Sequence, residues 1–256
     1  IKSPSPEAIT NNKEMYKVDS PQAEEFIHHE EILETLEYAW SHKDNRAFIE
    51  QLIEKAALCK GLTHREAATL LECDQPDLIE RIFHLAKEIK QKFYGNRIVM
   101  FAPLYLSNYC VNGCVYCPYH AKNKTIARKK LTQEEIRKEV IALQDMGHKR
   151  PKSNYAYHTE AMDRAMEGGI DDVGMGVLFG LNTYRYDFVG LLMHAEHLEA
   201  RFGVGPHTIS VPRICSADDI DAGDFPNAIS DDIFSKIVAV IRIAVPYTGM
   251  IISTRE

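Results

Sequence analysis

The sequence predicts an α/β fold, in which a helical N-terminal region leads into a (β/α) barrel that is incomplete in this chain. Three observations support this fold class. Apolar residues recur at helical spacing from Ala23 to Tyr94. After Gly95 the period changes, and apolar runs of strand length alternate with amphipathic helices. A loop that carries three cysteines directly follows the first of these runs, at the end of a strand where α/β barrels keep their chemistry.

The first part of the chain divides into an arm and a helical region. Residues 1–22 are polar, carry three prolines and are expected to form an N-terminal arm. Residues 23–95 are expected to be helical. In them, Thr63-His-Arg-Glu66 is a capping box that opens one helix, and Pro76 lies in the first turn of the next, which Gly95 ends. The stripe that predicts the core-facing side of this last helix is Leu78, Ile79, Ile82, Phe83, Ala86, Ile89 and Phe93.

Strands and helices alternate through the predicted barrel, residues 96–256. The first strand is expected at 97–106 and ends at the cysteine loop, and Thr132-Gln-Glu-Glu135 is a capping box that opens the following helix. Further helices are expected at 159–168, 186–202 and 231–244. Further strands are expected from 148 onward and at 173–181, 207–214 and 249–255.

The number of β/α units is too small for an eight-stranded barrel. The strand that starts at His148 stops at Arg150, and Pro151 follows without a strand body. Two further units of about 30 residues each would be needed. We therefore expect a gap in the chain between residues 150 and 151, which a disordered segment or a deletion would explain.

Composition excludes some classes of protein. The 256 residues carry a net charge of −7, which argues against nucleic acid as a partner because phosphate binding needs a basic surface. No apolar run approaches the ~20 residues that span a membrane, and residues 1–6 have no apolar signal core. Six cysteines, three of them clustered, suit a metal site in a reducing compartment. A cytoplasmic protein with no membrane partner is expected.

The cysteine loop is the strongest functional signal. Cys110, Cys114 and Cys117 have the spacing C-x3-C-x2-C, with Tyr116 before the third cysteine. Tetrahedral zinc sites and ferredoxin cubanes each take four protein ligands. Three closely spaced thiolates can hold three corners of a 4Fe–4S cluster and leave the fourth iron open, which is the arrangement that radical S-adenosylmethionine (SAM) enzymes use.

Other interpretations of the cysteines remain open. The three can be half of a zinc site whose fourth ligand lies elsewhere, or unligated thiols. Cys59 and Cys73 fall within helical patterns and are expected to be buried small hydrophobic residues. Cys215 follows a strand and is assigned no role.

Longer stretches carry a family likeness. They are the cysteine loop, the helical region that leads into the barrel, Gly147-His-Lys-Arg150, the segment from Tyr157 to Gly174, the segment from Gly205 to Arg213, and the segment from Ala244 to Glu256. In these the chain resembles the aromatic-amino-acid lyases of the radical SAM superfamily. Within them it resembles the tyrosine lyases that mature FeFe-hydrogenase, the HydG family, from about residue 50 onward.

This resemblance implies a cofactor set and a reaction. Cys110, Cys114 and Cys117 would bind a 4Fe–4S cluster whose open iron chelates SAM. The reaction would cleave the Cα–Cβ bond of L-tyrosine to p-cresol and dehydroglycine, the source of CO and cyanide for the hydrogenase H-cluster. An electron donor such as ferredoxin or flavodoxin and hydrogenase maturation partners are also implied.

Two parts of the family pattern are missing from this sequence. The strands that help hold the SAM amino group are not found after Arg150. The family's second, auxiliary Fe–S cluster is held by a C-terminal extension that does not occur here, and Cys215 does not match it.

The resemblance also suggests roles for side chains near strand ends. Tyr116 is expected near the adenine, with a packing aromatic as the alternative. Ser210 and Arg213 are expected to contact the cofactor. Arg255, assisted by Ser253, is expected to clamp the tyrosine carboxylate as the catalytic residue, because a guanidinium donates two parallel hydrogen bonds to a carboxylate. For each arginine a structural salt bridge is the alternative.

Two histidines of a predicted helix are expected to be structural, and other functions remain open for the chain. His194 and His197 lie three apart on a helix and are read as structural histidines rather than iron ligands. Alternative functions are the thiamine-pathway tyrosine lyase (2-iminoacetate synthase), a biotin-synthase-like sulfur inserter, a zinc-binding structural or nucleic-acid module, and an inactive scaffold.

Overall fold

The computed structural model describes residues 16–97, 107–110, 119–132, 155–170, 172–216 and 221–252. Several predictions fall outside these residues. They are the N-terminal arm up to residue 15 and the first strand expected at 97–106, of which only Arg97 is described. They also include the helix that opens near Thr132 and the suspected gap between 150 and 151.

The helical region contains α1 (Ala23–Phe26), α2 (His29–His42), α3 (Arg46–Ala57), α4 (His64–Glu72) and α5 (Pro76–Tyr94). The predicted capping box is confirmed. The Thr63 hydroxyl accepts from the Glu66 N–H at 3.3 Å, and the Glu66 carboxylate accepts from the Thr63 N–H at 2.9 Å. Helix α5 begins at the predicted proline and ends before Gly95, whose φ of +55° a residue with a side chain rarely adopts.

Three short parallel strands form the sheet of the described residues, in the order β1 (Gly174–Gly176), β2 (Thr208–Ser210) and β3 (Gly249–Ile251). Helix α9 (Tyr184–Phe202) connects β1 to β2, and α10 (Asp231–Ala244) connects β2 to β3. The predicted β/α alternation is therefore confirmed. The predicted barrel is seen only in part, because three strands of three residues each do not close a sheet.

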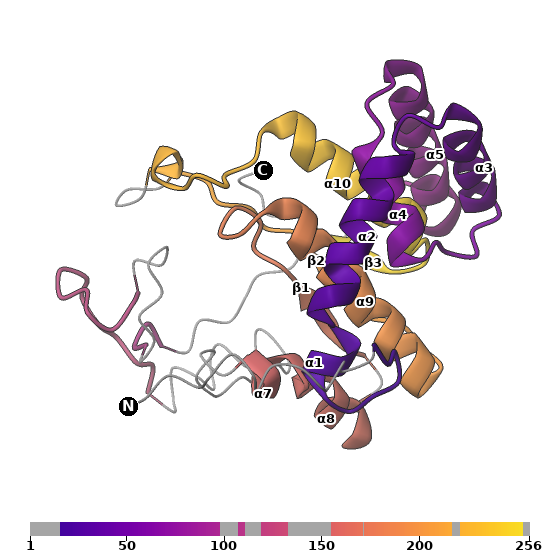
Figure 1. The fold of residues 1–256 in the computed structure, drawn as a ribbon. Coiled ribbons are helices and arrows are strands. Elements are labelled where there is room, and N and C mark those ends of the chain that lie inside the picture. The colour runs from indigo at the N-terminus through magenta and orange to yellow at the C-terminus, as the bar shows by residue number, and fades with distance from the viewer. Residues whose placement is uncertain are drawn as a thin grey trace, which may run out of the picture.

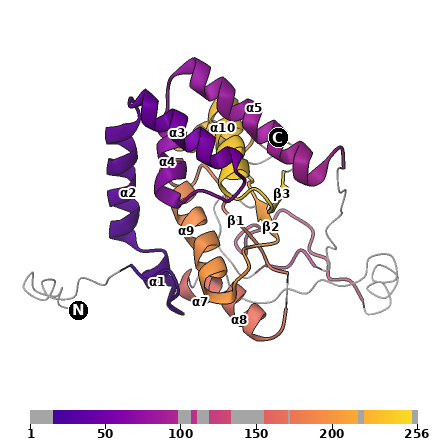
Figure 2. The ribbon, with the colours of Figure 1, turned by 90° about the vertical axis from the view of Figure 1, so that its right-hand side faces the viewer.

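The helical region and the two β/α units share one hydrophobic core. Helix α4 packs against α2, α9 and α10, and α5 packs against α10. Figure 1 shows α2 to α5 gathered at one side of the molecule, and Figure 2 views them from that side. The largest fully buried side chains come from both parts of the chain: Phe26, Ile32, Ile49, Leu70, Leu78, Ile82, Ile89, Phe179, Phe188, Leu192, Met193 and Leu198.

Two local predictions need correction. The helix expected at 159–168 consists of α7 (Tyr155–Thr159) and α8 (Ala161–Glu167), and a short 3-10 turn, η2 (Ala222–Asp224), precedes α10. Cys73 is fully buried as expected, but Cys59 is only half-buried. The reason is that α3 ends at Ala57 and is capped by Leu58, so Cys59 lies outside the helix with a φ of +56°.

Candidate functional site

The cysteine loop is described at its two ends. Cys110 is half-buried and makes no disulfide, whereas Cys114, Cys117 and Tyr116 lie outside the described residues. The chain before Cys110 pairs with the chain after the loop. Ser107 forms an antiparallel bridge with Lys130, and the Asn108 N–H donates to the Lys129 carbonyl at 3.1 Å.

The side chain of Asn108 adds two further bonds to this pairing. Its Oδ1 accepts from the Lys129 N–H at 2.6 Å, and its Nδ2 donates to the Ala127 carbonyl at 2.7 Å. Asn108, two positions before Cys110, is thus fixed to the segment that follows Cys117. This pairing closes the base of the loop.

The carboxyl ends of the three strands lie in register at Gly176, Ser210 and Ile251. Ser210 is half-buried at the end of β2, as predicted. A Cβ added at Gly176 would come within 2.5 Å of the Ser210 carbonyl oxygen, so the two strands approach each other closely because residue 176 is glycine. The contact of Ser210 with a cofactor stays a prediction.

Arg213 turns toward the start of α10. Its Nη2 lies 2.6 Å from Asp231 Oδ1, its Nη1 donates to the Ile229 carbonyl at 3.4 Å, and the guanidinium lies 4.7 Å from the centre of the Phe234 ring. These contacts correspond to the salt-bridge alternative. The cofactor role of Arg213 stays a prediction, as do the roles of Ser253 and Arg255, which lie outside the described residues.

Asp187 is a candidate that the sequence did not reveal. It lies in the first turn of α9, on the side of the β/α unit where β1 ends. Burial raises its pKa to about 6, and a hydrogen bond with Asn182 opposes this shift. A carboxyl group that titrates close to neutral pH is suited to carry a proton. In the sequence alone, Asp187 looks like any aspartate in the first turn of a helix, where its charge interacts favourably with the helix dipole.

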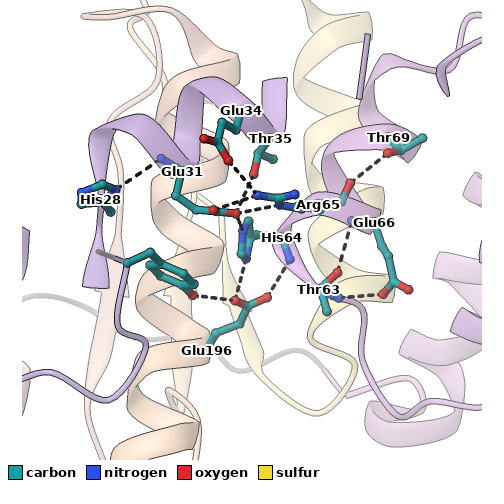
Figure 3. Close-up of polar contacts among 11 residues, drawn as sticks. His28, Glu31, Glu34, Thr35, Thr63, His64, Arg65, Glu66, Thr69 and Glu196 are labelled. Carbon is teal, nitrogen blue, oxygen red and sulfur yellow. Dashed lines mark hydrogen bonds and ion pairs between the residues drawn. The ribbon is translucent and has the colours of Figure 1, made fainter. Parts of the chain in front are cut away.

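A second polar cluster joins the helical region to the barrel helices (Figure 3). His64 of α4 lies between two carboxylates, with Nε2 at 2.9 Å from Glu31 Oε1 of α2 and Nδ1 at 2.7 Å from Glu196 Oε2 of α9. Arg65 donates to both oxygens of Glu31, at 2.7 and 2.8 Å. Both ring nitrogens face carboxylate acceptors, an arrangement that favours the protonated imidazole with its two N–H groups.

Both histidines of α9 are buried, and His197 is hydrogen-bonded through both ring nitrogens, as predicted for a structural histidine. His197 is fully buried, with Nε2 2.8 Å from Asp163 Oδ1 and Nδ1 2.6 Å from the Val18 carbonyl, and it stacks on Phe26. His194 is also buried, and its Nε2 has no hydrogen-bond partner. Burial, and then the neighbouring His197, lower the pKa of His194 to about 4. In the part of the chain that the structure describes, no group of three or more His, Cys, Asp or Glu side chains is arranged to hold a metal ion.

Comparison with known proteins assigns the chain to a family. The sequence model of the Biotin and Thiamin Synthesis associated domain matches residues 210–256. A crystal structure of HydG, a maturase of the [FeFe]-hydrogenase, is 42% identical with a TM-score of 0.82 over 90% of this chain and 68% of that one. HydG from Carboxydothermus hydrogenoformans is 31% identical with a TM-score of 0.78 over 91% and 72% of the two chains.

A more distant relative is 2-iminoacetate synthase of Escherichia coli K12. It is 22% identical in an alignment of 281 positions that covers 80% of this chain and 73% of that enzyme. Together with the three-cysteine loop and the β/α units, these matches define a radical SAM enzyme. Within that class, the chain belongs to the HydG family.

Membership in this family implies a 4Fe–4S cluster and SAM. The donor chemistry of the loop fits the cluster, because a half-buried thiol at a fixed loop base is a suitable iron ligand. Among the described residues, no helix combines the length and the apolar character needed to span a membrane.

Proposed function

We propose that this protein is a radical SAM lyase that cleaves the Cα–Cβ bond of L-tyrosine to p-cresol and dehydroglycine, from which CO and cyanide arise for FeFe-hydrogenase maturation. The observation that carries this proposal is the 42% identity to HydG over 90% of the chain, with a TM-score of 0.82. Membership alone defines the class of enzyme. The substrate and the products go beyond that class, and we propose them because of the likeness to this maturase.

The residues of this chain take distinct roles in the proposal. Cys110, Cys114 and Cys117 would hold the cluster, which together with SAM supplies a carbon radical that abstracts hydrogen. Arg255 would bind the tyrosine carboxylate with Ser253. Tyr116 and Ser210 would contact SAM, and Arg213 would do so or act only through its pair with Asp231. A ferredoxin or flavodoxin would donate the electron, and an auxiliary cluster would need ligands beyond this sequence.

The test is anaerobic reconstitution with iron and sulfide, reduction, EPR spectroscopy, and incubation with SAM and tyrosine. We expect a reduced-cluster signal that shifts on addition of SAM, together with 5′-deoxyadenosine, p-cresol, CO and cyanide. Cys110→Ser should lower the bound iron, while Cys215→Ser is the matched control and should leave it unchanged. A chain that binds zinc and no iron would overturn the proposal and favour a structural module.

The second candidate is a 2-iminoacetate synthase. It is favoured by the 22% identity to the E. coli enzyme over 80% of this chain and by the domain match at 210–256. Both candidates release p-cresol from tyrosine, so p-cresol does not separate them. If p-cresol forms without CO or cyanide, this second candidate replaces the maturase.

A further inference from the structure

One arginine contacts both ends of the cysteine loop. The half-buried guanidinium of Arg128 donates four hydrogen bonds to main-chain carbonyls. Its Nη1 reaches the Asn108 carbonyl at 2.6 Å and the Tyr119 carbonyl at 3.1 Å. Its Nη2 reaches the carbonyls of His120 and Asn123, both at 2.9 Å.

These carbonyls lie on the two sides of the cysteines in the sequence. Asn108 comes two residues before Cys110, and Tyr119 and His120 come two and three residues after Cys117. One rigid, permanently charged side chain therefore ties the entry of the loop to its exit. Closing a loop costs conformational entropy, and a contact that joins the loop ends before a ligand binds reduces the cost left for binding.

Asn108 reinforces the same connection from the other strand of the pair. Its side chain and main chain bond to residues 127 and 129, on either side of Arg128. The guanidinium is therefore held in place by the residue whose carbonyl it binds. Hydrogen bonds of this kind around a metal ligand fix the position of the ligand, and they do so best when the bonding residues also hold each other.

We propose that Arg128 is a positioning residue for the 4Fe–4S cluster, which preorganises the loop so that three thiolates are presented together. The inference rests on the cluster that family membership implies, and it is independent of the proposed lyase reaction. Arg128 acts through the main chain at Asn108, Tyr119, His120 and Asn123.

The experiment compares Arg128→Gln and Arg128→Lys with the unsubstituted protein and with Lys124→Ala. Lys124 is an exposed cation in the same segment and makes none of these four bonds, so it is the matched control for charge. Each protein is reconstituted anaerobically, and three quantities are measured: loss of iron to a chelator, the EPR spectrum of the reduced cluster without SAM, and thermal unfolding of the iron-free protein.

We expect both Arg128 variants to lose iron about 10- to 100-fold faster than the control, with a broadened EPR signal, while unfolding of the iron-free protein stays the same. Arg128→Lys keeps the charge but lacks the planar fork that spans four carbonyls. It therefore tests the proposal even if Arg128→Gln does not fold. The proposal would be overturned if Arg128→Lys lost iron at the rate of the control and gave the same EPR spectrum. It would also be overturned if the faster loss of iron only followed a lower unfolding temperature. A loaded protein that makes no p-cresol would refute the lyase proposal and leave this comparison intact.

Discussion

At the scale of single residues, the contacts of His64 set a pH dependence. Burial by itself lowers its pKa, but the bonds to Glu196 and Glu31 outweigh burial and raise the pKa above 6.5. A group whose pKa is raised in the folded state stabilises the fold below its unfolded pKa. That contribution disappears as the pH rises through the folded pKa.

The variant His64→Ala tests this contribution. We expect a loss of about 3 kcal/mol in the free energy of unfolding at pH 6, because two carboxylates then lose their shared partner. The loss should be smaller at pH 9, because the unsubstituted protein carries less charge on His64 at higher pH. Urea unfolding at both pH values measures the difference. His84→Ala, on the exposed face of α5, is the control. An equal loss at both pH values would contradict the charged state of His64.

His194 predicts the opposite dependence. Its folded pKa of about 4 lies below the unfolded value of 6.5, so its neutral form stabilises the fold at pH 7. That stability is lost as the pH falls from 6.5 toward 4, by about 3 kcal/mol. His194→Leu should remove this acid sensitivity. Thermal unfolding between pH 7 and 4 tests it, and parallel curves for the two proteins would show that His194 is not the group responsible.

Residue spacing in the sequence explains which of these sites could be foreseen. The cysteine loop is recognisable because its three side chains lie within eight positions, where spacing fixes geometry. His64 and Glu196 are 132 positions apart, and Glu196 looks like any helix-surface carboxylate until α4 and α9 pack together. Long-range pairs of this kind depend on packing and leave no local signal.

At the scale of elements, helix boundaries follow from local chemistry. Helix α10 occupies the predicted residues 231–244, and α9 begins two residues earlier than predicted. The strands are shorter than their apolar runs predicted, and β1 covers 174–176 instead of 173–181. A helix satisfies its own hydrogen bonds, whereas a strand extends only as far as a neighbour pairs with it. Among the described residues, the next pairing after β1 along this segment is the bridge of Phe179 with Arg213.

The two threonine caps allow a matched test of local chemistry. Thr63 caps α4 with a complete capping box, whereas Thr183 occupies the same position before α9 without a side-chain cap bond. Thr63→Ala should lower the free energy of unfolding by about 1 kcal/mol, and Thr183→Ala should have a much smaller effect. Urea unfolding of both variants is the measurement. Equal losses would mean that the capping box does not account for the start of α4.

At the scale of the whole molecule, the helical region is part of the same folding unit as the β/α units. Glu72 at the end of α4 forms a bidentate pair with Arg185 in α9, and Lys236 of α10 donates to the Cys73 carbonyl. Together with the shared core, these contacts connect the N-terminal helices to both barrel helices. The sequence predicted the two regions separately, because their contact depends on side chains more than 100 positions apart.

Within the described residues, in contrast, the sheet has three strands and does not close into a barrel. The alignment with the E. coli enzyme runs over 281 residues but covers 80% of this chain, about 205 of its 256 residues. About 76 aligned positions therefore have no residue here, which is comparable with two β/α units of about 30 residues each. We propose that the protein made in its natural host carries such units between Arg150 and Pro151.

Peptide mapping of the natural protein decides this point. Cleavage after glutamate would release the peptide Val140–Glu160 if Arg150 is joined directly to Pro151. Trypsin is unsuitable because it would cut after Lys149 and Lys152 and leave the junction in a peptide of three residues. We expect this peptide to be absent and longer peptides to take its place. If it is found, the deletion is genuine. The sheet then stays open at the strands expected to hold the SAM amino group, and the inactive scaffold becomes the favoured interpretation even if Cys110, Cys114 and Cys117 bind a cluster.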